Sequence, residues 1–152
     1  MTDIFKKLNL KDQTEIVVLH APESFEAALS SLQNIVVHRK LKAQHALQFG
    51  LAFVMQEKTL DEVSAAMAKQ AKGDALIWIA YPKKSSKKYT CEFDRDSAWR
   101  VLGAAGYEAV RMIAIDEDWS ALRFRQVDFI TTLKRRAEHT ISCVGKQRAS
   151  QA

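Results

Sequence analysis

The chain has 152 residues, with 23 Lys and Arg against 18 Asp and Glu, which gives a formal net charge of +5. That length suits one domain with a substantial core, and a composition of 47% hydrophobic and 27% charged residues excludes a disordered or fibrous chain. The positive charge is concentrated at the C-terminus, because residues 131–152 hold five basic residues and one acidic residue. We predict a single α/β domain over residues 1–130, nearly neutral overall, and a basic tail over residues 131–152.

No segment has the features of a membrane span or a secretion signal. The longest apolar run, residues 75–81, is far shorter than the roughly 20 residues that cross a bilayer, and polar residues follow Lys6 and Lys7. Cys91 and Cys143 lack the paired spacing of a disulfide framework or a zinc site, and the histidines show no metal-ligand spacing. We therefore expect a cytoplasmic protein with no metal and no membrane partner.

The first third of the chain predicts two strands with a helix between them, followed by a third strand. Residues 15–19 form a run rich in β-branched residues that is typical of a strand. Pro22 marks the first turn of the helix that follows, and residues 25–32 give this helix an apolar stripe. Residues 35–37 predict a short second strand, and the apolar run of residues 49–55 predicts a strand buried on both faces.

The rest of the domain continues this alternation and ends in a hairpin. A Thr-Leu-Asp-Glu capping box begins a predicted helix over residues 59–72, which Gly73 ends. Residues 75–81 are apolar throughout, as expected for a central parallel strand, and a further helix covers residues 96–105. Residues 107–125 contain two strands joined by a turn too short for a parallel pair. This order predicts a three-layer α/β domain with a mostly parallel sheet closed by an antiparallel C-terminal hairpin.

Two motifs carry a family resemblance. Residues 78–87 and 114–125 look like the signatures of a family of small bacterial α/β proteins of unassigned function. Residues 49–125 resemble the second half of the Rossmann-like methyltransferase fold, in which the last strand is inserted between its two predecessors. The resemblance implies a truncated methyltransferase-like sheet. It also shows two departures, because residues 20–25 lack the Gly-rich cofactor turn, and His-Arg-Lys at residues 38–40 stands where an acidic residue would hold a ribose.

Two distant motifs are expected to meet at the edge where open α/β sheets bind ligands, outside the carboxyl ends of the strands. The loop after residue 81 and the turn before residue 119 both lie at this edge if the last strand is inserted as the resemblance implies. The lysines and hydroxyls of the loop suit a phosphate or a carboxylate, but such a loop is also typical of a solvated turn. The candidate ligand-binding residues are Tyr81, Lys83, Lys84, Ser85, Asp116, Trp119 and Ser120.

Two of these candidates have a structural alternative. Trp119 either stacks on a ligand or belongs to the core. Asp116 either serves as a general acid or base, or caps the turn in which it lies. We assign no catalytic residue from the sequence.

Three functions stay open. The first is a non-catalytic binding or interaction protein of methyltransferase-like fold, without a cofactor, whose partner is a small anion or another protein. The second is a small-anion binder or an enzyme that uses Lys83, Ser85, Asp116 and Trp119. The third is weak nucleic-acid binding through the basic tail, which is disfavoured because the tail lacks the interleaved aromatic residues that stack on bases.

Overall fold

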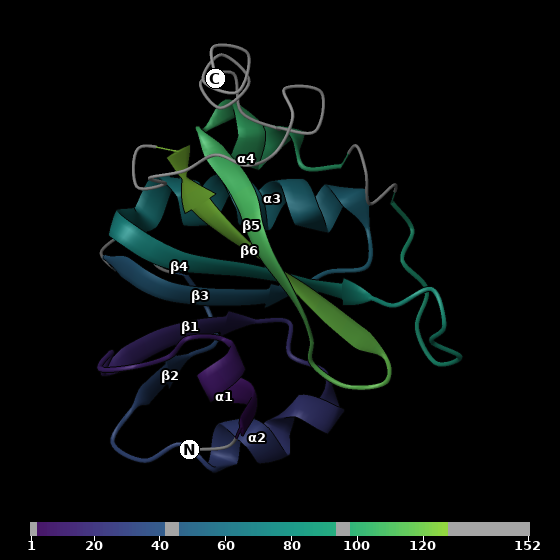
Figure 1. Ribbon diagram of the computed structural model, residues 1–152, viewed down its shortest axis with the longest axis horizontal. Coiled ribbons are helices and arrows are strands. Elements are labelled where there is room, and N and C mark those ends of the chain that lie inside the picture. The colour runs from purple at the N-terminus through teal and green to yellow at the C-terminus, as the bar shows by residue number, and fades with distance from the viewer. Residues whose placement is uncertain (1–2, 42–45, 94–97, 128–152) are drawn as a thin grey trace.

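The computed structural model describes residues 3–41, 46–93 and 98–127, which form one twisted sheet covered by helices on both faces (Figure 1). The strands are β1 (Glu15–Leu19), β2 (Val36–His38), β3 (Leu47–Phe53), β4 (Ala71–Pro82), β5 (Tyr107–Ala114) and β6 (Trp119–Gln126). Their order in the sheet is β2-β1-β3-β4-β6-β5. The first four strands run parallel, whereas β6 is antiparallel to both β4 and β5.

Two helical layers cover the sheet. α1 (Asp3–Lys7) and α2 (Glu26–Ser30), the latter preceded by a 3-10 turn at Glu23–Phe25, lie on one face. α3 (Glu57–Gln70) and α4 (Arg100–Ala104) lie on the other face (Figure 1). Each layer buries its own apolar cluster against the sheet. Within the described ranges, no helix combines the length and the apolar character that crossing a membrane would need.

The predicted fold class is confirmed, including the place of the last strand. All six predicted strands are present, within a few residues of their predicted ends. β6 lies between β4 and β5, so that Leu122 pairs with Ile79 on one side and Ala121 pairs with Ile113 on the other. A parallel set followed by an inserted antiparallel strand is the arrangement that the methyltransferase resemblance implies.

A glycine in β3 brings α3 close to the sheet. Leu60, Val63 and Met67 form the buried face of α3. Gly50 lies opposite this helix, and a Cβ atom added to it would stand 2.5 Å from Cε of Met67. The missing side chain therefore permits a close approach of helix and strand.

The helix α3 differs from its prediction at both ends. It begins two residues earlier, after Gln56 in an extended conformation, so Thr59 lies inside the helix and is not the N-cap. It also ends before Gly73, which lies within β4 at a φ of 57° and does not end the helix. The predicted start of the last helix, near residue 96, lies outside the described residues.

Candidate functional site

The two motifs meet at the carboxyl edge of the sheet, as expected. Tyr81 pairs with Ser120 in the β4–β6 ladder. Just beyond this pair, the backbone N–H of Lys83 donates to the carbonyl of Asp118 at 2.8 Å. The loop after β4 and the β5–β6 turn therefore form one structural unit, on the right-hand side of Figure 1.

Tyr81 and Trp119 do not line a common pocket, because they lie on opposite faces of the sheet. Tyr81 is 7% exposed and packs against Trp99 on the face covered by α3 and α4. Trp119 is 2% exposed, and its ring centroid lies 5.1 Å from that of Phe53 and 5.0 Å from that of Tyr89. Both rings are core residues in this structure, and a role in ligand binding stays a prediction for each.

Asp116 caps the β5–β6 turn. Its Oδ1 atom accepts the backbone N–H groups of Asp118 and Trp119, at 2.8 and 2.9 Å. This is the turn-forming alternative, in which an Asp side chain bonds its own backbone two residues on. The hydrogen bonds hold the start of β6 beside the end of β4.

Ser86, which belongs to the loop expected to meet the turn but is not one of the seven candidate ligand-binding residues, fastens the β4 loop to the turn. Its hydroxyl donates to Oδ1 of Asp118 at 2.8 Å and accepts the backbone N–H of Tyr89 at 3.0 Å. The neighbouring Ser85, predicted as a binding residue, is exposed. Serine hydroxyls commonly bond nearby backbone in loops, but this tendency applies equally to Ser85 and Ser86, so the sequence does not distinguish them.

Replacing Ser86 by alanine is expected to lower the free energy of unfolding by about 1 kcal/mol, because the hydroxyl loses its hydrogen bonds with Asp118, Tyr89 and Lys88 at a half-buried site. Ser85→Ala is the matched control and is expected to leave stability unchanged. Urea unfolding of the two variants measures the difference. Equal effects would contradict the assignment of Ser86 as the residue that joins the two segments.

The β4 loop carries four lysines that form no ion pair with any described carboxylate: Lys83, Lys84, Lys87 and Lys88. Lys83 is half-buried and the other three are exposed. The hydrogen bond between Ser86 and Asp118 fixes the base of this loop. The ammonium groups are therefore held at one end of the sheet edge, where an anion can reach them.

Packed side chains cover the switch point of the sheet. This point lies between β1 and β3, because the order of the strands along the chain reverses there. His20 follows β1 with a φ of 58° and an exposed side chain, where the methyltransferase resemblance implies glycine. Phe25 packs against Phe53 at the end of β3, with ring centroids 5.0 Å apart and each residue 3% exposed. The backbone N–H of Glu92 donates to the carbonyl of Met55, so the chain after β4 returns across the end of β3.

The position after β2 holds a cation. Arg39 donates two hydrogen bonds to the carboxylate of Glu26 in α2, each 2.8 Å long. These hydrogen bonds lower the pKa of the Glu26 carboxyl group. A guanidinium bound to a neighbouring helix thus stands where an acidic residue would bind ribose hydroxyls.

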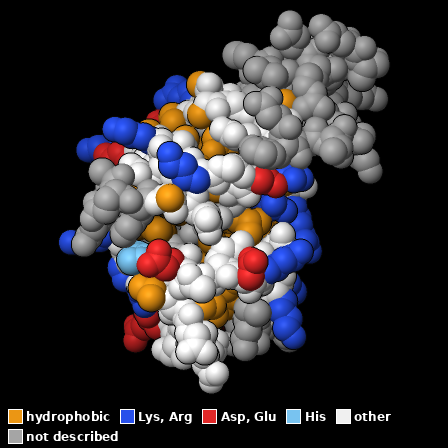
Figure 2. Space-filling view, turned by 90° about the vertical axis from the view of Figure 1, so that its left-hand side faces the viewer, with side chains coloured by type: hydrophobic (Ala, Val, Ile, Leu, Met, Phe, Trp, Pro, Cys, Tyr) orange, Lys and Arg blue, Asp and Glu red, His pale blue; other side chains and the backbone are white. Residues whose placement is uncertain are grey.

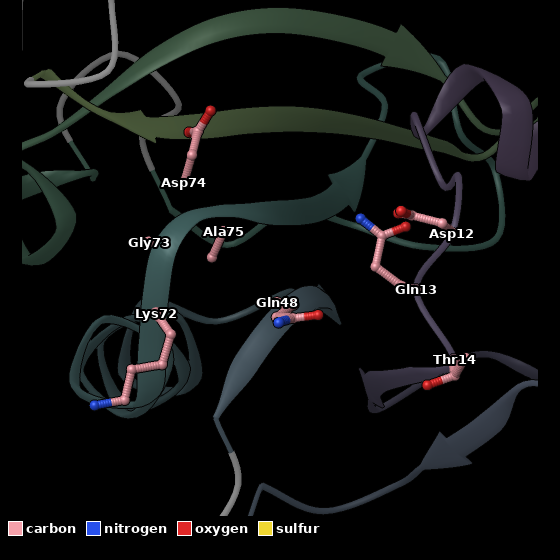
Figure 3. Close-up of a pocket in the computed structure, with 8 residues that line it drawn as sticks. All are labelled: Asp12, Gln13, Thr14, Gln48, Lys72, Gly73, Asp74 and Ala75. Carbon is pink, nitrogen blue, oxygen red and sulfur yellow. The ribbon is translucent and has the colours of Figure 1, made fainter.

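A polar cavity of about 420 Å³ lies at the opposite edge, near the amino ends of β1, β3 and β4 (Figure 3). In Figure 3 the side chain of Asp74 rises toward β6, where Arg125 holds its carboxylate. Figure 2 views the molecule from the side that carries the amino ends of β3 and β4, and Lys and Arg side chains are seen along both margins of the picture. In the described ranges, no group of three or more His, Cys, Asp or Glu residues is placed to hold a metal. The residues lining the cavity include Asp12, Gln13, Thr14, Gln48 and Lys72.

The strand order and the switch point define a methyltransferase-like α/β fold. The chain aligns with an S-adenosylmethionine-dependent methyltransferase from Aquifex aeolicus with a TM-score of 0.57 and 13% identity, over 82% of this chain and 88% of that one. For one from Clostridium acetobutylicum the TM-score is 0.51, with 4% identity, over 82% and 89% of the two chains. At these identities the likeness shows the fold alone. No family model and no curated protein matches the sequence, so the resemblance to a family of small bacterial proteins stays an expectation.

Some predictions fall outside the described residues. The basic tail of residues 131–152 and Cys143 are among them, so nucleic-acid binding through the tail stays a prediction. The domain boundary at residue 130 and a cytoplasmic location are likewise still predictions. Cys91 is a free thiol, half-buried in the segment that crosses the end of β3.

Proposed function

We propose that this chain is a non-catalytic binding protein of methyltransferase-like fold that does not take up S-adenosylmethionine. The observation that carries the proposal is the contact between Phe25 and Phe53, whose rings meet at the switch point where open α/β sheets bind ligands. Separating these rings would expose two buried side chains, at about 1.5–3 kcal/mol each. The side chain of His20 adds to this obstacle, because a cofactor has to approach the backbone closely at that turn.

Isothermal titration calorimetry with S-adenosylmethionine is expected to give no saturable heat up to millimolar concentrations. His20→Gly is the informative variant, because it restores the glycine but leaves the contact between Phe25 and Phe53 in place. We expect no binding by this variant either. Saturable binding to the unaltered chain at micromolar concentrations would overturn the proposal.

The binding surface that we propose is the lysine loop, residues 83–88, and its partner is an acidic segment of another protein. Lysine ammonium groups are flexible point charges, which suit a run of carboxylates better than one planar anion held in fixed geometry. A small-anion site that also uses Asp116 and Trp119 has less support. One oxygen of Asp116 is engaged in the turn, and the ring of Trp119 is packed in the core.

A short fluorescent peptide of Glu and Asp is expected to bind the chain with an affinity that falls as salt concentration rises. Combining Lys83→Gln with Lys84→Gln is expected to weaken this binding several-fold in fluorescence anisotropy. The control combines Lys58→Gln with Lys69→Gln, which removes the same charge from α3. Equal losses in the two double variants would indicate attraction by net charge alone and would overturn the assignment of the loop.

A further inference from the structure

Three arginines lie on one face of the β5–β6 hairpin. Arg111 pairs directly with Arg123 across the two strands, and Arg125 is two residues farther along β6 on the same face. Side chains at directly paired positions start from Cβ atoms only about 4.5–5.5 Å apart, and like charges placed there destabilise a sheet. A pair of guanidinium groups at this register is therefore expected to be stabilised by a bound anion.

An irregularity in β5 places Arg111 on this face. The register shifts between Ala109 and Arg111, so that Val110 is an extra residue in β5. In a regular strand, Arg111 would share a face with Tyr107 and Ala109, which belong to the core beneath α3 and α4. The bulge turns the arginine to the opposite face, beside Arg123, and bulges are over-represented next to functional sites for this reason.

The described carboxylates nearest this face form no ion pair with Arg111 or Arg123. Asp74 binds Arg125 through Nε and Nη2, at 2.6–3.0 Å. Glu108, opposite Arg125 on the same face, is fully buried.

No described residue forms an ion pair with Arg111 or Arg123. Arg111 is exposed, whereas Arg123 is half-buried and its Nε atom is inaccessible, without a described hydrogen-bond partner. Burial and the neighbouring Arg125 lower the pKa of Arg123, Asp74 opposes this effect, and Arg111 adds to it. The exposed side chain of Arg111 and the accessible part of the half-buried Arg123 thus lie together at a site that one small anion can reach.

We propose that Arg111 and Arg123 bind the phosphate group of a small phosphorylated ligand. Guanidinium groups present paired N–H donors that match two phosphate oxygens, and half-buried pairs of this kind are stronger than solvated ones. Asp74 pairs with Arg125, so two of the three guanidinium groups on this face, those of Arg111 and Arg123, form no ion pair with a described residue. This small number of groups favours a single phosphate over the repeated phosphates of a nucleic acid.

Thermal unfolding in inorganic phosphate and in glucose 6-phosphate tests the proposal, against glucose and against sodium chloride at matched ionic strength. Both phosphates are expected to raise Tm in a saturable way, and glucose 6-phosphate is expected to act at lower concentration if the site takes an ester. Arg111→Gln is expected to remove most of this shift. Without phosphate and at low salt, the same variant is expected to melt at or above the Tm of the parent, because the repulsion is relieved.

The matched control is Lys69→Gln, which removes one charge from the exposed surface of α3 and is expected to keep the full phosphate shift. Arg123→Gln gives a second measurement at the half-buried partner. A phosphate shift no larger than that of chloride, or one that Arg111→Gln leaves intact, would overturn the proposal. Binding of single-stranded DNA that depends on Arg111 and is stronger than that of either phosphate would overturn it in favour of a polymeric ligand. These outcomes are independent of the lysine loop, which the acidic peptide probes separately.

Discussion

Replacing Trp119 by alanine is expected to lower the free energy of unfolding by about 3–5 kcal/mol, the range for truncation of a large buried aromatic side chain. The ring is 2% exposed and packs against Phe53 and Tyr89. Urea unfolding should show a lower midpoint with an unchanged slope. A variant as stable as the parent would contradict the assignment of Trp119 to the core and would favour the ligand-stacking alternative.

A comparison with Trp78 separates packing from hydrogen bonding. Nε1–H of Trp78 donates to the carbonyl of Leu8 at 2.9 Å, which holds the segment after α1 on the sheet. Nε1 of Trp119 is buried without a hydrogen-bond partner in the described part of the chain. Trp78→Phe is therefore expected to cost about 1–3 kcal/mol more than Trp119→Phe, because only the former leaves a buried acceptor unpaired. Equal losses would show that the hydrogen bond to Leu8 contributes nothing.

The strands could be predicted because each is a distinct apolar run, whereas the short helices depend on tertiary contacts. β3 and β4 follow the apolar runs of residues 49–55 and 75–81 closely. α1 was not predicted, because five residues are too few for a stable isolated helix. Phe5 holds it in place by packing against Phe25, with ring centroids 5.7 Å apart. Such a contact between residues far apart in the sequence leaves no local pattern.

The meeting of the two site motifs could be predicted, but the faces of their side chains could not. Insertion of the last strand predicts that residue 119 begins beside residue 81, and the observed partner of residue 81 is residue 120, one residue away. Because successive side chains of a strand alternate in direction, that single residue places Tyr81 and Trp119 on opposite faces. The direction of Arg111 could not be predicted for a similar reason. The bulge at Val110 turns this side chain to the opposite face, and no turn residue in the sequence indicates a bulge there.

Replacing Gly50 by valine is expected to lower the free energy of unfolding by about 1–3 kcal/mol, or somewhat more, through overpacking between β3 and α3. The added Cβ would lie 2.5 Å from Cε of Met67 and 3.2–3.3 Å from the methyl groups of Leu47. Gly50→Ala is expected to cost less, because the methyl end of Met67 is flexible and can move aside. The unfolding free energies from urea titrations give the order of the two variants, and an alanine variant less stable than the valine variant would contradict a steric cause.

A double-mutant cycle tests whether Met67 is the residue that requires glycine at this position. Met67→Ala alone is expected to cost about 2–5 kcal/mol by opening a cavity. Combined with Gly50→Ala, the loss is expected to be smaller than the sum of the single losses by about 0.5–3 kcal/mol, because the new methyl group then has space. Gly106→Ala is the control, since it is strained by a φ of 89° but would have no atom within 4 Å of its Cβ. Its effect is expected to add to that of Met67→Ala, and the same coupling in both cycles would show that the coupling does not come from the contact between residue 50 and Met67.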